Sequence, residues 1–155
     1  MNFERTADFV LKDVSIPESA LDMAATLLID TIGVAAGAAG LASGHIARDH
    51  AFAFHGAGAP EHAAHMMFDG RQASVSGVAF AAATQIDNLD GHDGLNQTKG
   101  HIGCAVVPAL FAFAEARPEL SARDALKALV MSYEVAARAA FALHSSVSDY
   151  HTSGA

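Results

Sequence analysis

The sequence is poor in cysteine, tryptophan and positive charge. It contains one cysteine, Cys104, and no tryptophan. A single cysteine cannot form a disulfide within the chain or supply the several thiolates of an iron–sulfur cluster, so we expect a protein of the reducing cytoplasm. Nine Lys and Arg residues stand against 17 Asp and Glu residues, which gives a formal net charge of −8. This balance disfavours nucleic acid and acidic membrane surfaces as partners.

The sequence also shows no signal peptide, because its first eight residues carry charges of both signs and lead into no long apolar core. The apolar run Ile102–Ala114 is too short to cross a bilayer and contains Pro108. We therefore expect a soluble protein without a membrane partner. Because 52% of the residues are hydrophobic and only 17% are charged, we expect a homodimer, a higher homo-oligomer or a piece of a larger protein to cover the apolar surface.

Helical periodicity dominates the chain and predicts one all-α domain over residues 1–155. Ser15-Ile-Pro-Glu18 has the form of a capping box and predicts the start of a long helix. The segment 65–70 is expected to be a short strand or extended piece that ends in an Asp-Gly turn. Six helices are expected. The first covers residues 3–11, the second runs from within 15–18 to a break near Gly37 or Gly40, and the third runs from 43 or 44 to about 55. The fourth starts at Ser74 or Ser76 and ends at about 89, the fifth covers 102–116 with a kink at Pro108, and the last starts at Ser121.

Residues 86–101 concentrate the reactive side chains between two alanine-rich apolar segments. In sixteen residues they hold three aspartates, two histidines, one lysine, one threonine and three glycines. Proton donors, proton acceptors and a cation together are more than a surface loop requires. This stretch is therefore the candidate site.

Each candidate in this stretch also has a structural interpretation. Asp90 and Asp93 are close enough to raise each other's pKa or to orient a histidine, but they can equally cap a helix end and a turn. His101 precedes an apolar helix, where its ring can face a cleft and the first amides can bind a carboxylate, or it can be an ordinary flanking residue. Thr98 and Lys99 suit a substrate carboxylate, whereas Lys99 alone is typical of a solvated surface.

The pattern does not favour a metal or an organic cofactor, and we expect neither. His62 and His65, with Glu61 beside them, and the pair His92-Asp93 are the possible ligands, but the spacing of a zinc hydrolase helix and a cysteine cluster are missing. Cys104 lies in an apolar helix and is expected to be a small buried hydrophobe.

Several segments together resemble the MmgE/PrpD family, which includes 2-methylcitrate dehydratase, cis-aconitate decarboxylase and iminodisuccinate epimerase. The resemblance rests on the aspartate pair and on the Thr-Lys-Gly-His segment that leads into an apolar helix, and it extends over nearly all 155 residues. The segments are Ile29-Asp-Thr-Ile-Gly33, Asp90-Gly-His-Asp-Gly94, Thr98-Lys-Gly-His-Ile-Gly103, Ala105-Val-Val-Pro-Ala-Leu110 and Tyr150-His-Thr-Ser-Gly154.

The resemblance implies cofactor-free proton abstraction next to a carboxylate of a small di- or tricarboxylate, as in a lyase or isomerase. It assigns catalytic roles to Asp90, Asp93, His101 and His151. Thr98, Lys99 and His92 are then the expected substrate-binding residues. The His92-Asp-Gly94 form, together with Thr98-Lys-Gly-His101, looks closer to the iminodisuccinate epimerase branch.

Family members are longer and continue into further helices and a mixed α/β lid. The resemblance therefore implies that the chain corresponds to the N-terminal helical part, without the lid, and that its activity needs the missing C-terminal part. Two other interpretations stay open: a non-catalytic helical module that binds a carboxylate or mediates oligomerisation, and a metal-dependent hydrolase built on His92-Asp93.

Overall fold

The computed structural model describes residues 3–146 and is mostly helical, as the sequence predicts. The only sheet in this range is a short antiparallel hairpin. The elements are α1 (Phe3–Leu11), α2 (Glu18–Ala38), α3 (Ala42–Phe54), the 3-10 turn Pro60–His62, β1 (Ala63–His65), β2 (Gln72–Ser74), α4 (Val75–Asp87), α5 (Gly103–Glu115) and α6 (Ala122–Ser146).

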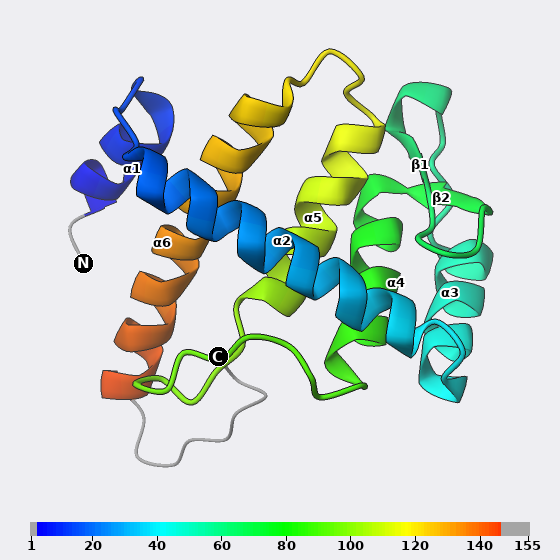
Figure 1. Cartoon of the computed structure of the whole chain (residues 1–155). Helices are drawn as coiled ribbons and strands as arrows, with labels where there is room; N and C mark the ends of the chain where they lie inside the picture. The colour runs from blue at the N-terminus through cyan, green and yellow to red at the C-terminus, as the bar shows by residue number, and fades with distance from the viewer. Residues whose placement is uncertain (1–2, 147–155) are drawn as a thin grey trace.

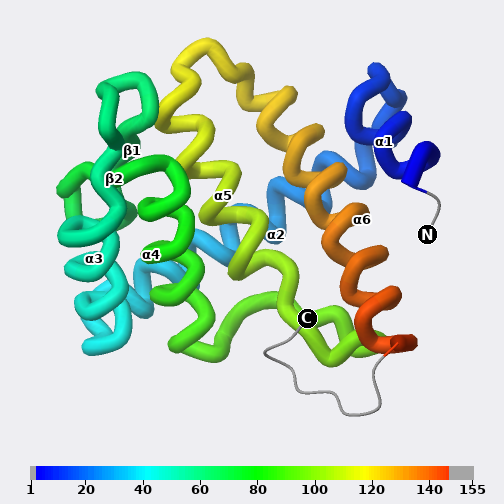
Figure 2. Tube along the Cα trace, turned by 180° about the vertical axis from the view of Figure 1, so that it is seen from behind, coloured from blue at the N-terminus to red at the C-terminus, as the bar shows by residue number. Residues whose placement is uncertain are grey.

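Four helices lie side by side in the order α3, α4, α5 and α6, and α2 crosses one face of this layer. Figure 2, seen from behind, places α2 on the far side of the same four helices. Helix α1 lies beside α6 at one edge, whereas the hairpin lies near α3, α4 and α5 at the other edge.

Two core clusters hold the layer together, and the first, rich in alanine, lets its helices approach closely. One core cluster joins α3, the hairpin, α4 and α5 through residues such as Ala47, Ala51, Ala81 and Ala112. A second cluster joins α2 to α5 and α6 through Ala24, Val107 and Leu129, and Leu129 is fully buried. Close packing of apolar surface in these clusters fixes the positions of α4, α5 and α6.

Hydroxyl caps determine two of the helix starts. The side chain of Ser74 accepts a hydrogen bond from the Gly77 amide at 3.1 Å and begins α4. The Ser121 hydroxyl accepts one from the Asp124 amide at 3.1 Å and precedes α6. The predicted capping box at Ser15 is wrong, because α2 begins after Pro17 without a side-chain cap. Proline fixes a backbone angle that already suits a helix start, which explains the later beginning.

Helix α2 is long and apolar enough to cross a membrane by length and composition. In this fold it packs against α4, α5 and α6. Its opposite face leaves Met23 and Ile29 exposed, with 59% and 71% of their surface accessible. The helix therefore covers the core with one face and leaves two large apolar side chains exposed among polar ones on its outer face.

The segment 88–102 connects the end of α4 to the start of α5. In both Figure 1 and Figure 2 it lies at the same end of the layer as the C-terminal end of α6. The candidate residues of the sequence analysis are therefore held between the ends of three packed helices.

Candidate functional site

The imidazole of His101 is held by the main chain of the loop itself. Its Nδ1 atom lies 2.7 Å from the carbonyl oxygen of Asp93. A carbonyl can only accept a hydrogen bond, so Nδ1 carries the proton and donates it. In the neutral ring, Nε2 is then the unprotonated nitrogen. The orienting group is therefore the main-chain carbonyl of Asp93, and not the carboxylate of Asp90 or Asp93 that the sequence suggested.

The carboxylate of Asp93 is used at the start of α5. Its Oδ1 atom accepts a hydrogen bond from the Gly103 amide at 2.9 Å, which places a negative charge at the positive end of the helix. A β-carbon at position 103 would collide with this carboxylate and with the Tyr133 hydroxyl of α6. The amide that we expected to bind a substrate carboxylate is thus already occupied.

His92 is the most unusual side chain of the loop. Its side chain is only 1% exposed, and neither ring nitrogen has a hydrogen-bond partner among the described residues. The ring lies 4.2 Å from that of His101, centroid to centroid, and Nε2 lies 3.5 Å from Oδ1 of Asp87. Buried polar groups without partners are costly, and each one calls for an explanation such as a bound ligand.

Asp90 is exposed and lies beside the rings of His92 and His101. Its backbone has a φ of 54°, in the left-handed region that is strained for most residues and tolerated by aspartate. A carboxylate oxygen of Asp90 and ring nitrogens of His92 and His101 all lie within 4.8 Å of one another. We call Asp87, Asp90, His92, Asp93 and His101 the loop cluster.

The negative charges of the loop cluster are not matched by the described ion pairs of lysine and arginine. Those of Lys12, Arg48, Arg71, Arg123, Lys127 and Arg138 all go to carboxylates outside the loop cluster. Asp87 faces the His92 ring and the Cys104 thiol, whose Sγ lies 4.0 Å from Asp87 Oδ1. The loop cluster therefore provides a locally negative environment that favours a proton or another cation.

Thr98 and Lys99 lie in a tight turn closed by the bridge between Leu95 and Gly100. Thr98 is fully buried, and its hydroxyl donates to the Leu95 carbonyl at 3.2 Å. Lys99 is exposed and has a φ of 51°. The turn therefore uses Thr98 to hold its own shape and leaves the Lys99 side chain toward solvent.

Three residues, Asp87 of the loop cluster and two residues beside it, were not assigned to the site from the sequence. Asp87 ends α4, Cys104 lies in the first turn of α5, and Tyr133 reaches in from α6. Burial raises the pKa of the Cys104 thiol to about 11, and the charges of Asp87 and Asp93 act in the same direction. Burial and Asp93 also raise the pKa of Tyr133 above its ordinary value of 10. The one sequence signal that could have found Tyr133 is its place among the apolar residues of its helix, which pack against the core.

The other histidines singled out in the sequence do not join the loop cluster. His65 pairs with Glu115 through Nδ1, and its Nε2 lies 3.1 Å from the Gln72 amide nitrogen. His62 ends the 3-10 turn and is exposed. His151 lies outside the described residues. The structure thus brings together Asp90, His92 and His101, with Asp93 as their support.

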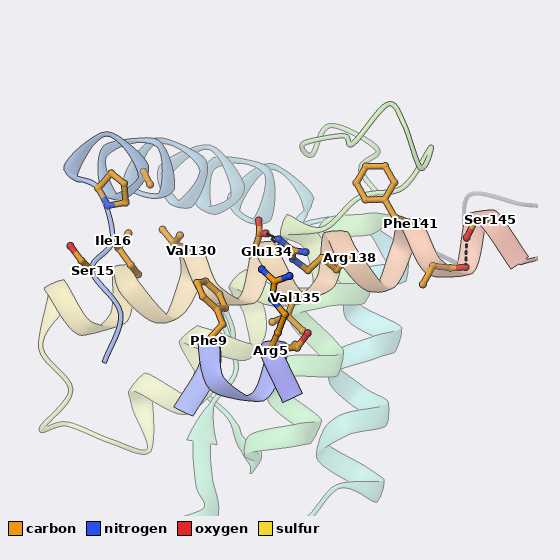
Figure 3. A pocket seen from close by; sticks show the side chains of 14 residues that line it. Arg5, Phe9, Ser15, Ile16, Val130, Glu134, Val135, Arg138, Phe141 and Ser145 are labelled. Carbon is orange, nitrogen blue, oxygen red and sulfur yellow. Dashed lines mark hydrogen bonds and ion pairs between the residues drawn. The ribbon is translucent and has the colours of Figure 1, made fainter. Parts of the chain in front are cut away.

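The described cavities lie along α6 and not at the loop cluster. One of 860 Å³ is lined by α1, by residues at the start of α2 and by α6; Figure 3 shows Arg5 and Phe9 facing Val130 and Glu134 across it. Another of 660 Å³ is bounded by Val106 and the α6 residues around Met131. The cleft that the His101 ring was expected to face is thus not one of these two cavities.

The fold and the loop cluster together define a helical domain with a histidine–carboxylate site. The MmgE/PrpD N-terminal domain family matches residues 4–155 of the chain. The chain belongs to this family. No curated protein and no solved structure matches it.

Proposed function

We propose that the chain is the helical part of a lyase or isomerase that removes a proton next to a carboxylate of a small di- or tricarboxylate. The observation that carries the proposal is the contact between His101 Nδ1 and the Asp93 carbonyl at 2.7 Å. It fixes both the orientation and the tautomer of an imidazole beside Asp90 and His92. A histidine held in one tautomer is what general acid–base catalysis requires.

His101 is the proposed base in this mechanism. With its proton on Nδ1, its Nε2 atom accepts the proton from the carbon next to the substrate carboxylate. The ring then becomes an imidazolium, which the neighbouring carboxylate charge of Asp90 stabilises. Asp93 is a positioning residue, because its carbonyl holds the ring and its carboxylate holds α5.

Lys99 and His92 are the proposed groups for the substrate carboxylates. Lys99 is the cation of the loop and its side chain is exposed, so it can meet an anion from solvent. His92 has ring nitrogens that are free to donate or accept. His151 and Asp90 keep as predictions the catalytic roles that the family resemblance gives them. Thr98, expected to bind substrate, is buried and bonded to the Leu95 carbonyl, so we propose that it acts by holding the turn that carries Lys99.

We also propose a cytoplasmic homodimer or higher homo-oligomer. Large apolar side chains on several helices support this, since Ile29, Phe113 and Phe141 have 71%, 58% and 47% of their surface accessible. Exposed apolar side chains of this size favour association. The net charge of −8 argues against nucleic acid as a partner.

The test is solvent deuterium incorporation, followed by NMR, into iminodisuccinate, 2-methylcitrate and cis-aconitate or their products. It compares a form of the protein that shows turnover with its His101→Gln variant. We expect a loss of at least ~100-fold in the variant. His62→Gln, which changes an exposed histidine outside the loop cluster, is the control and is expected to exchange normally. Near-normal exchange in His101→Gln would remove His101 from the mechanism.

A second candidate function is a non-catalytic module that binds a carboxylate. The observation in its favour is that Lys99 is exposed and can pair with a carboxylate at the surface, while neither of the two described cavities lies at the loop cluster. Binding of the three acids without any deuterium incorporation would favour this function over catalysis.

A further inference from the structure

We propose that Asp87, His92 and Cys104 bind a divalent transition metal of the Zn²⁺ class where α4 meets α5. The sequence alone led us to expect no metal. A metal on His92 Nε2 would replace the substrate-binding role proposed for this residue above, and the metal proposal depends on no other part of that function. It assigns a common purpose to three side chains that approach from the end of one helix, a loop and the start of the next helix.

The distances between the three ligand atoms suit a tetrahedral centre. His92 Nε2 lies 3.5 Å from Asp87 Oδ1, and Cys104 Sγ lies 4.0 Å from the same oxygen. All three ligand atoms lie within 4.8 Å of one another. Metal bonds of about 2.0–2.3 Å at tetrahedral angles place ligand atoms roughly 3.3–3.6 Å apart. Small side-chain adjustments therefore complete three of four positions, and solvent can supply the fourth.

The buried imidazole of His92 is the independent sign of a ligand. A histidine with a 1% exposed side chain normally spends at least one ring nitrogen on a hydrogen bond. Both nitrogens of His92 have none within residues 3–146. A metal on Nε2 satisfies the buried ring and uses the atom that already faces Asp87 and Cys104.

The local charge and the types of ligand atom also favour a divalent transition metal at this position. Asp87 and Asp93 lie close enough to Cys104 to act on its thiol, and among the described residues no lysine or arginine pairs with either carboxylate. A divalent cation neutralises this charge. Imidazole, thiolate and carboxylate together suit Zn²⁺ or Co²⁺ better than Mg²⁺ or Ca²⁺, which prefer oxygen ligands.

His92 also belongs to the second group, formed with Asp90 and His101. We assign the metal to the group that contains Cys104 because the thiolate is the strongest ligand for a borderline-soft metal. A metal at this position joins α4 to α5 and immobilises the connecting loop. It does not disturb the hydrogen bond from His101 Nδ1 to the carbonyl of Asp93.

Co²⁺ titration of the whole chain provides the test, because Cys104 is its only cysteine. Any sulfur-to-cobalt charge-transfer band must therefore come from this residue. We expect the band to saturate at one Co²⁺ per chain and to disappear when Zn²⁺ is added. Absence of the band at stoichiometric metal would overturn the proposal, as would saturation at half a metal per chain, which would mean that two chains share the ion through Cys104.

Two variants and a control separate this site from adventitious binding. Cys104→Ser is expected to abolish the charge-transfer band, and His92→Leu to weaken Co²⁺ binding at least ~100-fold. His62→Gln, which changes an exposed histidine, is expected to bind as the wild type does. An unchanged titration in His92→Leu would overturn the site.

A measurement without substitutions covers the case in which a variant does not fold. Zn²⁺ is expected to raise the unfolding temperature of the unmodified chain and to protect Cys104 from a thiol reagent. Since binding to the folded state alone stabilises it by mass action, the shift should increase with Zn²⁺ concentration. No shift and no protection would contradict the proposal.

Discussion

Two groups of buried polar side chains are built in opposite ways: one joins α3 and the hairpin turn to Gln85 of α4, and the other lies in the loop that follows α4. Near the hairpin, the guanidinium of Arg48 bonds to Asp69 at 3.1 Å, to the Ala39 carbonyl at 2.9 Å and to the Gln85 amide oxygen. Arg71 binds the second oxygen of Asp69 at 2.6 Å. We call Arg48, Asp69, Arg71 and Gln85 the arginine network.

The loop cluster differs because its buried groups lack such partners. His92 is as buried as Arg48, yet its ring nitrogens have no hydrogen bond in the part of the chain that the structure describes. A satisfied network stabilises one arrangement of the chain, whereas an unsatisfied one retains binding capacity at a cost in stability. The comparison thus assigns a structural purpose to the arginine network and a chemical purpose to the loop cluster.

The largest effect is expected from breaking the arginine network. Arg48→Met removes a buried cation from Asp69 and from the Gln85 amide oxygen. We expect the free energy of unfolding, measured by urea denaturation, to fall by about 3–5 kcal/mol, because the remaining partners stay buried. Arg123→Gln, at an ion pair whose two side chains are 58% and 70% exposed, is the control and should change stability little. An equal effect of the two substitutions would contradict the structural role of the network.

Crowding at the base of the loop cluster is tested next. In Gly103→Ala the new β-carbon collides with the Asp93 carboxylate and the Tyr133 hydroxyl. We expect the free energy of unfolding to fall by about 1–3 kcal/mol. We also expect the chemical shifts of the His101 ring to change in NMR spectra. Gly33→Ala in α2 meets nothing within 4 Å and should be neutral or stabilising. A stable Gly103→Ala protein with unchanged His101 signals would contradict the packing described here.

The pH dependence of stability should come in part from Asp69. Its hydrogen bonds to Arg71 lower its pKa from 3.8 to about 2. Because the folded-state pKa lies below the unfolded value, ionised Asp69 stabilises the fold above pH 3.8, and this contribution is lost as the pH falls toward 2. Because Arg71 is partly exposed and its charge is screened by solvent, we expect ionised Asp69 to contribute about 1–2 kcal/mol to the free energy of unfolding. Asp69→Asn should flatten the acid limb of the stability curve, and an unaltered limb would exclude Asp69 as its source.

The smallest effect, and the most unusual in sign, is expected at His92. His92→Leu replaces a buried imidazole that lacks hydrogen bonds by an apolar side chain. In the presence of a chelator we expect the free energy of unfolding to stay the same or to rise by up to about 1 kcal/mol. Differential scanning calorimetry measures it. A loss of stability as large as that of Arg48→Met would show that His92 serves the fold.

Much of the fold follows from local sequence signals. The helices α1, α3 and α5 begin and end within about two residues of their predicted bounds, and Ser74 and Ser121 cap helices as their hydroxyls suggest. These features depend on neighbouring residues, which is why the sequence can show them. The start of α2 was misplaced because Pro17 alone sets it, without Ser15.

The arrangement of the loop cluster depends on contacts that sequence spacing does not show. That His101 binds the Asp93 carbonyl and that Asp93 binds the Gly103 amide are results of the path of the loop. Asp87 and Tyr133 come close only through the packing of α4 and α6 against α5. The sequence therefore indicated which stretch holds the chemistry, but it did not show which atoms meet there.

The tautomer of His101 tests the central claim most directly. Long-range ¹H–¹⁵N NMR at a pH where the ring is neutral distinguishes a proton on Nδ1 from one on Nε2, and the loss of the signal in His101→Gln assigns it. The contact with the Asp93 carbonyl predicts a proton on Nδ1 and an unprotonated Nε2. A proton on Nε2, or a ring that exchanges between both forms, would contradict the account.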